Sequence, residues 1–383
     1  MNRRIRLVSV LTAGLLAAGC GSAASQAATP AVPAAPPSLD TSLVTTTGTW
    51  AVAVMGGSAA NHNNFWQLFV RPTGSATWRL ATPPGVASNG GLVLAGLSAG
   101  TVLAGFRPSQ DLSYSPLATT KDTGKVWSPG LLDAALADVP GALAADPGTG
   151  HLLALLSDGT AETSGPGGTS WTRLTTRQAI AASPAGARCR PDSLTAVAFS
   201  PSGKPMLAAS CSHPGTAGIF SHARGSWQLA APELPASYAR QPITVLRLTT
   251  TGGTTTALLA AGNAPATRLL AAWSSDGGSR WSLSAPLPLD DATLRAASAG
   301  PGGSFGVMLS NHHAAAISRT AHSWQELPVL PPGTATLAAS PSGGWNALAV
   351  HRTQLTIWQA APGADTWSGE QVLRVPVQFG SSG

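Results

Sequence analysis

Residues 120–127 read TKDTGKVW and residues 274–281 read SSDGGSRW, so one eight-residue pattern occurs twice in the chain. Each stretch has a small hydroxyl residue, an Asp two places later, a Gly two places after that and a Trp three places further on. The patterned residues are Asp122, Gly124 and Trp127 in the first copy and Asp276, Gly278 and Trp281 in the second. An Asp side chain can accept hydrogen bonds from backbone N–H groups of its own turn, and Gly adopts the positive φ that tight turns require. The pattern therefore predicts one type of hairpin at two places in the chain.

Tryptophan after a small polar turn recurs beyond these two copies. The successive spacings are 49, 44, 56, 54, 43 and 43 residues, between Trp78, Trp127, Trp171, Trp227, Trp281, Trp324 and Trp367. A period in the forties to fifties, with several short strands in each unit, is typical of propeller blades. Seven Trp-marked units therefore predict seven blades.

Each period contains four short strands. Residues 194–232 contain the runs LTAVAFS, PMLAASC, AGIF and WQLAAP, separated by turns rich in Gly, Pro and Ser, and residues 335–370 repeat this order. The 43 Gly and 31 Pro residues in a chain of 383 oppose a helical fold. The sequence thus predicts an all-β protein, a β-propeller of seven four-stranded blades. The two patterned stretches would join third to fourth strands, and residues 372–379 (VLRVPVQF) would add a strand that closes the ring.

The repeated pattern resembles the Asp-box (BNR) repeat of sialidases, sortilin-type receptors and many bacterial propellers. Two units match well, whereas the other five keep the Trp and lack the Asp. The resemblance covers nearly all of residues 41–375 and implies a propeller without fixing its function. It does not extend to sialidase chemistry, because the chain has only two tyrosines, Tyr114 and Tyr238, and no Arg-Ile-Pro motif, only FRP at 106–108 and VRP at 70–72.

The N-terminus has the pattern of an export signal. Arg3, Arg4 and Arg6 precede an apolar run, residues 7–18, that is too short to span a bilayer. The run ends in LAAGC, which resembles the lipobox of bacterial lipoproteins and implies that Cys20 is lipidated; a secreted protein with a Cys near its cleavage site is the alternative. We expect a signal peptide over residues 1–19, an Ala/Pro/Ser-rich tether over 20–40, and a propeller domain over 41–383. The domain would be exported and anchored by lipid to the outer face of the bacterial cell membrane.

The composition excludes several classes of function. The net charge of +6 falls to +3 without the three arginines of the signal peptide, and no Lys/Arg run resembles a nucleic-acid footprint. No glycine-rich phosphate loop or nucleophile elbow is present, so we expect no cofactor. Cys189 and Cys211 form an even pair in an exported chain, which predicts a disulfide, and two thiols alone are insufficient for zinc.

Polar residues gather in the loops expected to join second to third strands, which would emerge on one face, here termed the candidate ligand face. Its members are His62, Asn64, Arg107, Asp111, Tyr114, His312, His313 and His351. Function concentrates on loops that a rigid scaffold holds, although loops are also polar because their backbones face water. Two adjacent histidines would need a third ligand from another loop to bind a metal, so we predict no metal site.

These features favour a cell-envelope lipoprotein that acts as a non-enzymatic binding or assembly scaffold for a protein or a glycan. A glycan-acting hydrolase with a diverged sialidase-like site is the alternative, and it would need two carboxylates that converge on one pocket. Among these loops only Asp111 supplies a carboxylate, while Glu233 and Asp192 lie in connections between blades. That scarcity favours binding over hydrolysis. A purely structural role without a ligand is the third possibility.

Overall fold

The computed structural model describes residues 42–56, 64–84, 91–97, 100–107, 117–129, 140–166 and 168–375. All of them belong to one compact unit, residues 33–383. The expected signal peptide and tether, with Cys20, lie outside the described residues. Among the helices in the described part, none has the length and apolar character needed to cross a bilayer.

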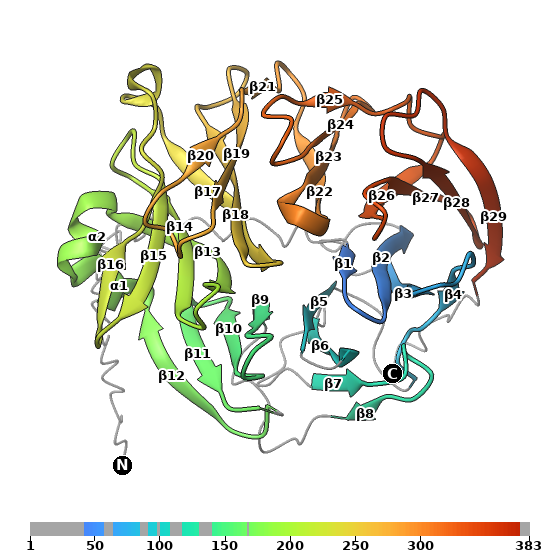
Figure 1. Cartoon of the computed structure of the whole chain (residues 1–383), viewed down its shortest axis with the longest axis horizontal. Helices are drawn as coiled ribbons and strands as arrows, with labels where there is room; N and C mark the ends of the chain where they lie inside the picture. The colour runs from blue at the N-terminus through green and yellow to red at the C-terminus, as the bar shows by residue number, and fades with distance from the viewer. Residues whose placement is uncertain are drawn as a thin grey trace, which may run out of the picture. The chain divides into compact units, whose positions relative to one another are not determined.

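The described residues form consecutive antiparallel meanders of four strands (Figure 1). In chain order the strands are β1 (Ser42–Val44), β2 (Gly48–Gly56), β3 (Asn64–Pro72) and β4 (Arg79–Leu80); β5 (Gly91–Gly96), β6 (Val102–Arg107), β7 (Leu117–Thr120) and β8 (Ser128–Pro129); β9 (Pro140–Ala145), β10 (Leu152–Leu156), β11 (Thr160–Ser164) and β12 (Trp171–Thr176); β13 (Pro191–Phe199), β14 (Pro205–Cys211), β15 (Gly218–Ala223) and β16 (Ser226–Leu229); β17 (Ile243–Thr251), β18 (Thr254–Ala261), β19 (Arg268–Ser274) and β20 (Ser282–Leu283), with β21 (Leu287–Pro288); β22 (Leu294–Ala299), β23 (Phe305–Leu309), β24 (Ala314–Ile317) and β25 (Gln325–Glu326); and β26 (Thr334–Ala339), β27 (Trp345–His351), β28 (Gln354–Ala360) and β29 (Ser368–Arg374). These meanders are called sheets one to seven below.

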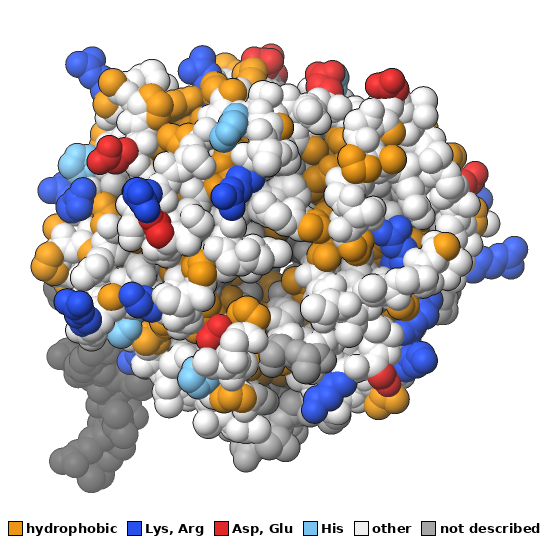
Figure 2. Space-filling model, in the orientation of Figure 1, with side chains coloured by type: hydrophobic (Ala, Val, Ile, Leu, Met, Phe, Trp, Pro, Cys, Tyr) orange, Lys and Arg blue, Asp and Glu red, His pale blue; other side chains and the backbone are white. Residues whose placement is uncertain are grey.

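The sheets follow one another round a ring, as in a β-propeller (Figure 1). Figure 2, in the same orientation, shows basic and acidic side chains scattered over this face of the ring. The first strand of each sheet is innermost, and β1 contacts β5 on one side and β26 on the other. The predicted all-β propeller fold is confirmed. The blade count stays a prediction, because β14 also pairs with β17 at Ser210 and Cys211, which merges sheets four and five into one nine-stranded sheet.

The strand order fixes which loops share a face. Because neighbouring strands are antiparallel, loops between second and third strands emerge on the same face as the connections from one sheet to the next. That face is the candidate ligand face. Loops between first and second strands, and between third and fourth strands, lie on the opposite face.

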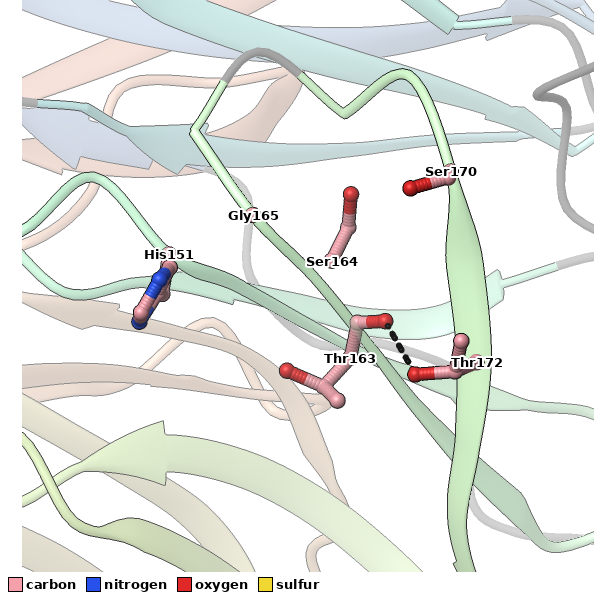
Figure 3. Close-up of a pocket in the computed structure, with 6 residues that line it drawn as sticks. All are labelled: His151, Thr163, Ser164, Gly165, Ser170 and Thr172. Atoms are coloured by element: carbon pink, nitrogen blue, oxygen red, sulfur yellow. Dashed lines mark hydrogen bonds between the residues drawn. The ribbon is translucent and has the colours of Figure 1, made fainter.

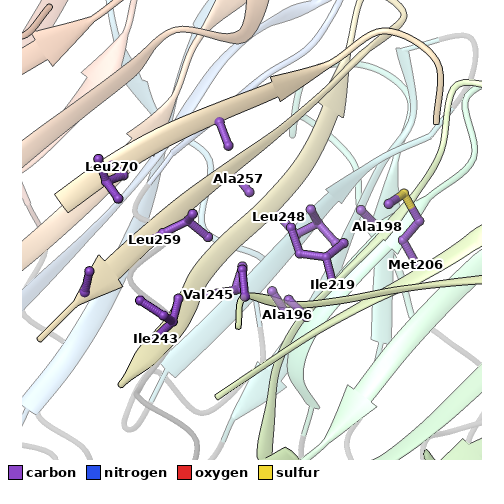
Figure 4. Close-up of a cluster of buried hydrophobic side chains, with 14 of the residues drawn as sticks. Ala196, Ala198, Met206, Ile219, Ile243, Val245, Leu248, Ala257, Leu259 and Leu270 are labelled. Atoms are coloured by element: carbon purple, nitrogen blue, oxygen red, sulfur yellow. The ribbon is translucent and has the colours of Figure 1, made fainter. Parts of the chain in front are cut away.

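The core lies between adjacent sheets rather than in one central cluster. Between sheets four and five, for example, small and branched apolar side chains interdigitate, as Figure 4 shows. Ile243, Val245, Ala257 and Leu259 there are fully buried. A strand that is covered on both faces buries side chains of both faces, so its sequence is apolar along its whole length. This explains why many of these runs show no alternation of apolar and polar residues. Alanine lets neighbouring sheets approach closely.

Four of the seven repeated tryptophans are hydrogen-bonded to the sheet before their own. The indole Nε1 of Trp281 donates to the Ala230 carbonyl oxygen at 2.9 Å, and Ala230 directly follows the outer strand of the preceding sheet. Three further indoles make the equivalent bond at 3.0 to 3.1 Å: Trp127 to Ala81, Trp324 to Ala285 and Trp367 to Pro328. The Trp period in the sequence is therefore a period of contacts between sheets.

Side chains join sheet seven to sheet one. The Gln371 amide accepts from the Trp78 backbone N–H and donates to the Trp78 carbonyl, both at 2.8 Å. The Arg71 guanidinium donates to the hydroxyl of Ser340 at 2.8 Å and the side-chain oxygen of Asn346 at 3.3 Å. The expectation of an extra closing strand over residues 372–379 was wrong in its described part. Residues 372–374 extend β29, because they continue its ladder with β28, and residues 376–379 lie outside the described residues.

Two short helices interrupt the all-strand pattern between sheets three and four. They are α1 (Arg177–Ala182) and α2 (Pro184–Cys189). The Thr176 hydroxyl caps α1 by accepting from Ala179 N at 3.1 Å, and the Ser183 hydroxyl caps α2 by accepting from Gly186 N at 3.0 Å. Both helices belong to a connection between sheets, so they lie on the candidate ligand face, with α2 against β16. The 3₁₀ turns η4 (Ala236–Tyr238) and η5 (Pro301–Gly303) complete the described helical elements.

Candidate functional site

The two aspartate turns, Thr120–Trp127 and Ser274–Trp281, lie between the third and fourth strands of sheets two and five. In the second turn Asp276 Oδ1 accepts hydrogen bonds from the backbone N–H groups of Ser279 and Arg280 at 3.0 and 2.9 Å. The Ser274 hydroxyl donates to the same Oδ1 at 2.9 Å and accepts from Gly278 N at 2.8 Å. Asp122 and Thr120 make the corresponding bonds in the first turn. These carboxylates hold hairpins together on the opposite face and line no described cavity.

The hydrogen bonds of the second turn make its stability depend on pH. The backbone N–H of Arg280, followed by the Arg280 side chain at 3.0 Å, lowers the pKa of Asp276 from 3.8 to about 2. A depressed folded-state pKa contributes stability that is present above the unfolded value and is lost as the pH falls through the folded value. We therefore expect the unfolding midpoint in urea to fall between pH 4 and pH 2 less steeply in Asp276→Asn than in the wild type.

The matched control for this pH dependence is Asp365→Asn. Asp365 lies in the equivalent hairpin of sheet seven, and its carboxylate makes none of the hydrogen bonds found in the described part of that turn. It should keep the acid dependence of the wild type. Identical acid profiles for Asp276→Asn and the wild type would contradict the role assigned to Asp276.

The structure places part of the predicted ligand-face set. His312 and His313 occupy the β23–β24 turn, His351 ends β27, and all three are exposed. They belong to neighbouring sheets, and no described hydrogen bond joins them. Asn64 begins β3 and Arg107 ends β6, at the same face, with their side chains undescribed. His62, Asp111 and Tyr114 lie outside the described residues.

Metal-ligating side chains do not gather within the described ranges. Within those ranges, no three His, Cys, Asp or Glu side chains lie close enough together to hold a metal ion. His313 instead donates its backbone N–H to Asn311 Oδ1 at 3.2 Å, so Asn311 serves the turn.

A cavity of about 340 Å³ opens on the candidate ligand face beside α2. We call it the α2 pocket. Its lining comes from three segments: Arg188 of α2; Gly215, Thr216 and Ala217 of the β14–β15 loop; and Leu229, Ala231, Pro232, Glu233 and Leu234 at the end of β16 and after it. Ala217 and Pro232 are buried, whereas Arg188 and Glu233 are exposed. The lining of the pocket thus includes one exposed side chain of each charge sign, Arg188 and Glu233.

A disulfide and backbone hydrogen bonds join the first two walls of the α2 pocket. Cys189, the last residue of α2, is bonded to Cys211 at the end of β14, with the two Cα atoms 5.0 Å apart, which confirms the predicted disulfide. Next to it, His213 N donates to the Cys189 carbonyl at 3.0 Å and Ser212 N donates to the Arg190 carbonyl at 3.0 Å. The helix and the β14–β15 loop are therefore one rigid piece.

The third wall is joined to β15 by a backbone hydrogen bond from Ala230 N to the Ile219 carbonyl at 2.8 Å. Close backbone packing also holds the second wall against the segment after η4. Gly215 N donates to the Gln241 carbonyl at 2.8 Å. Gly215 has φ +76°, and a Cβ added there would lie 2.8 Å from Ala239 Cα, so only glycine fits this approach. Tyr238, which shares a loop with Glu233, is 5% exposed and packs into the core between sheets four and five. Sequence reasoning missed the α2 pocket, because neither α2 nor this close approach has a periodic signal.

A second, smaller hollow of about 240 Å³ lies on the opposite face at sheet three (Figure 3). It is lined by His151, Thr163, Ser164, Gly165, Ser170 and Thr172. Thr163 donates to the Leu152 carbonyl at 3.0 Å and Thr172 to the Thr163 carbonyl at 3.4 Å, so both hydroxyls serve the sheet. In Figure 3 the hydroxyls of Ser164 and Ser170 point toward one another. Apart from His151, this hollow has no ionisable lining residue.

One carboxyl group in the described residues has a raised pKa. Burial raises the pKa of Glu162 on β11, the Arg173 guanidinium opposes that shift, and the negative charge of Asp158 adds to it. Arg173 is the cross-strand partner of Glu162 on β12, and Asp158 lies in the β10–β11 turn on the candidate ligand face. Neither carboxylate lines the α2 pocket or the hollow at sheet three. Sequence reasoning missed Glu162 because burial cannot be read from its local sequence.

Comparison with known proteins supports the fold and leaves the family open. No family model matches the chain, and no curated protein matches it by sequence. A crystal structure of a Lactobacillus plantarum protein is similar with a TM-score of 0.57 and 11% identity, over 86% of this chain and 97% of that one. A GH74 xyloglucanase from Xanthomonas campestris is similar with a TM-score of 0.56 and 15% identity, over 89% of this chain and 55% of that one. The WD40 β-propeller domain of Doa1 has a TM-score of 0.45 and 11% identity, over 81% of this chain and 86% of that chain. At these identities the first two similarities show the fold alone.

Proposed function

We propose that this protein is a cell-envelope lipoprotein that acts as a non-enzymatic binding scaffold, and that a protein or a glycan docks on its candidate ligand face. The observation that carries the proposal is the α2 pocket. Three chain segments that are separate in sequence are held around it by the Cys189–Cys211 disulfide and by backbone hydrogen bonds. A site that is rigid before binding loses little conformational entropy when the ligand arrives.

One sequence feature supports the cellular setting of the proposal, and another supports the family of propellers to which we assign the chain. The lipobox-like LAAGC implies a lipid on Cys20, and the membrane attachment proposed here rests on that residue, which lies outside the described residues. The aspartate turns have the hydrogen bonds that their pattern requires, which supports assignment of the chain to the Asp-box propellers.

A glycan-acting hydrolase is the second candidate, and Glu162 favours it. A carboxyl group with a raised pKa beside a second carboxylate is the arrangement that supplies a general acid. The similar fold of a xyloglucanase fits this reading. Against it, the ladder sets Glu162 opposite Arg173, and no described cavity includes either acid. An ion pair that only stabilises the fold also shifts the pKa of its carboxyl group. We therefore place the binding scaffold ahead of the hydrolase.

An assay of the reducing ends released from polysaccharides distinguishes the binding scaffold from the hydrolase. The full chain is incubated with a panel of cell-wall polysaccharides that includes xyloglucan, alongside Glu162→Gln. We expect no release above the blank for either protein. Release by the wild type that falls about 100-fold or more in Glu162→Gln, as loss of a general acid requires, would make the protein a hydrolase.

A further inference from the structure

The outer strands of the sheets differ in how much free edge they expose. An outer strand pairs on one side only, and its other edge is a template for pairing with another chain. Among the described outer strands, β4, β8, β20 and β25 have two residues each, which leaves little to pair with. β16 has four residues and lies against α2. The two long outer strands are β29, with seven residues, and β12, with six.

Every second residue of β29 directs its backbone groups away from the sheet. Val375 N donates to the Thr353 carbonyl at 2.9 Å, and the ladder with β28 continues in register through residues 371–374. Backbone groups of successive residues alternate in direction in an antiparallel ladder. Residues 371 and 373 therefore bond to β28, whereas residues 372 and 374 direct their N–H and C=O groups to the free edge. Figure 1 shows β29 at the outer rim of the ring, with no described strand beyond it.

The side chains of β29 alternate in the same way. Leu373 packs in the core between sheets seven and one, and Gln371 makes the two hydrogen bonds to sheet one given above. Glu370, Val372 and Arg374 are all exposed, Val372 at 50%. Neither charged side chain has a printed ion pair or hydrogen bond to another described residue. An exposed valine thus lies between two charges of opposite sign, both of which are available to a partner.

The order of these charges makes the strand complementary to itself. If two copies of β29 pair antiparallel about a two-fold axis at Val372, each Glu370 lies opposite the Arg374 of the second copy. Opposite charges across an antiparallel pair stabilise it, and like charges destabilise it. The one bulge of β29 adds a residue at Gly369, before this segment, so residues 370–374 stay in phase. The other long outer strand, β12, has Arg173 as its single charge and lacks this complementarity.

We infer that β29 pairs antiparallel with the β29 of a second copy of this chain and forms a two-fold symmetric dimer through that edge. Such an interface uses the same patch on both copies. The contact is small, so we expect a weak dimer with a Kd of roughly 10–100 µM. This inference goes beyond the proposed binding function and does not depend on it, because β29 supplies no residue to the α2 pocket.

Reversal of the two charges, one at a time and then together, tests the pairing. Sedimentation velocity of the full chain over a concentration series gives the Kd. Glu370→Arg and Arg374→Glu each bring two pairs of like charges together, and we expect each variant alone to raise the Kd about tenfold. An equal mixture of the two variants should form a heterodimer with a Kd near that of the wild type, because every cross-strand pair is again of opposite charge. A variant that had failed to fold would not recover in the mixture.

The matched control for charge is Arg224→Glu. Arg224 is an exposed arginine in the β15–β16 turn of sheet four, on the opposite face. Its reversal changes the net charge of the chain as Arg374→Glu does, and it should leave the Kd unchanged.

Val372→Cys tests the position of the two-fold axis. Residues directly opposite each other in a hydrogen-bonded antiparallel pair have Cα atoms about 5.5 Å apart, which is within the range of a disulfide. We expect mild oxidation to convert Val372→Cys to a covalent dimer on a non-reducing gel. Val126→Cys replaces another exposed valine, in the aspartate turn of sheet two, and should stay monomeric. Both variants keep Cys20, so Val126→Cys also measures cross-linking through that residue.

Two results would overturn the inference. One is a wild type that is monomeric throughout the concentration series, with no covalent dimer of Val372→Cys; the edge is then unpaired or pairs with a strand of a different protein. The other is a dimer whose Kd does not respond to the charge reversals, or is not restored in the mixture, because the two copies then meet elsewhere. Either result leaves the proposed binding scaffold standing, since its ligand face is tested by other variants.

Discussion

Replacing Cys189 and Cys211 together by Ala lowers the free energy of unfolding by about 3 kcal/mol, as expected for a disulfide that closes a loop of this length. The two residues are 22 positions apart, and the bond joins α2 to the end of β14. Both are buried, at 0% and 2% exposure, and they pack in the core between sheets three and four. Removing the bond frees the unfolded chain and also releases one wall of the α2 pocket. Urea unfolding of the full chain measures the loss.

Reduction of the wild type is the control for the disulfide. If the disulfide stabilises the protein by constraining the unfolded chain, dithiothreitol should lower the free energy of unfolding of the wild type in urea by as much as the double substitution does. In the double variant, α2 and the β14–β15 loop are coupled only by the hydrogen bonds to the carbonyl groups of residues 189 and 190. A loss below about 1 kcal/mol would contradict the role given to this bond.

Gly278→Ala is expected to cost about 3 kcal/mol, because it combines backbone strain with a collision. Gly278 has φ +92°, and a Cβ added there would lie 2.9 Å from Ala230 Cβ and 3.0 Å from the Ala230 carbonyl oxygen. That oxygen accepts the Trp281 indole at 2.9 Å. The new methyl group therefore separates sheets four and five where they are joined.

Gly277→Ala is the matched control in the same turn. Gly277 also has a positive φ, +72°, but its added Cβ would have no contact closer than Ser200 Cβ at 3.8 Å. It should cost only the conformational penalty, about 1 to 2 kcal/mol. The excess for Gly278→Ala in urea unfolding measures the contact between sheets. Equal losses in the two variants would show that the contact with Ala230 is not tight.

The fold could be predicted from the sequence because its signals are local. The bonds of each aspartate turn lie within eight residues, so the Asp, Gly and hydroxyl positions appear as one short pattern. The Trp period was equally visible. The partner of each indole was not, because it is a backbone carbonyl 39 to 51 residues earlier, and every residue has a carbonyl.

The candidate site was harder to predict for a physical reason. The helices α1 and α2 have six residues each, too few for a helical period, although their caps Thr176 and Ser183 were present in the sequence. The β14–β15 wall of the α2 pocket depends on the approach of Gly215 to Ala239, a contact between residues 24 positions apart that no local sequence pattern reveals. His312, His313 and His351 lie in or beside loops between second and third strands, and the face of such loops follows from strand order alone; that this face binds a ligand stays a prediction.

Two variants, each with a Trp that fills one of the two cavities, test most directly whether partners bind to the candidate ligand face. Thr216→Trp fills the α2 pocket on that face, and Ser170→Trp fills the hollow at sheet three on the opposite face. Retention of a displayed library of random linear peptides is measured on the full-length wild type and on both variants. We predict that Thr216→Trp loses most of the retained peptides and that Ser170→Trp keeps them. Loss of retention with Ser170→Trp alone would place the binding function on the opposite face.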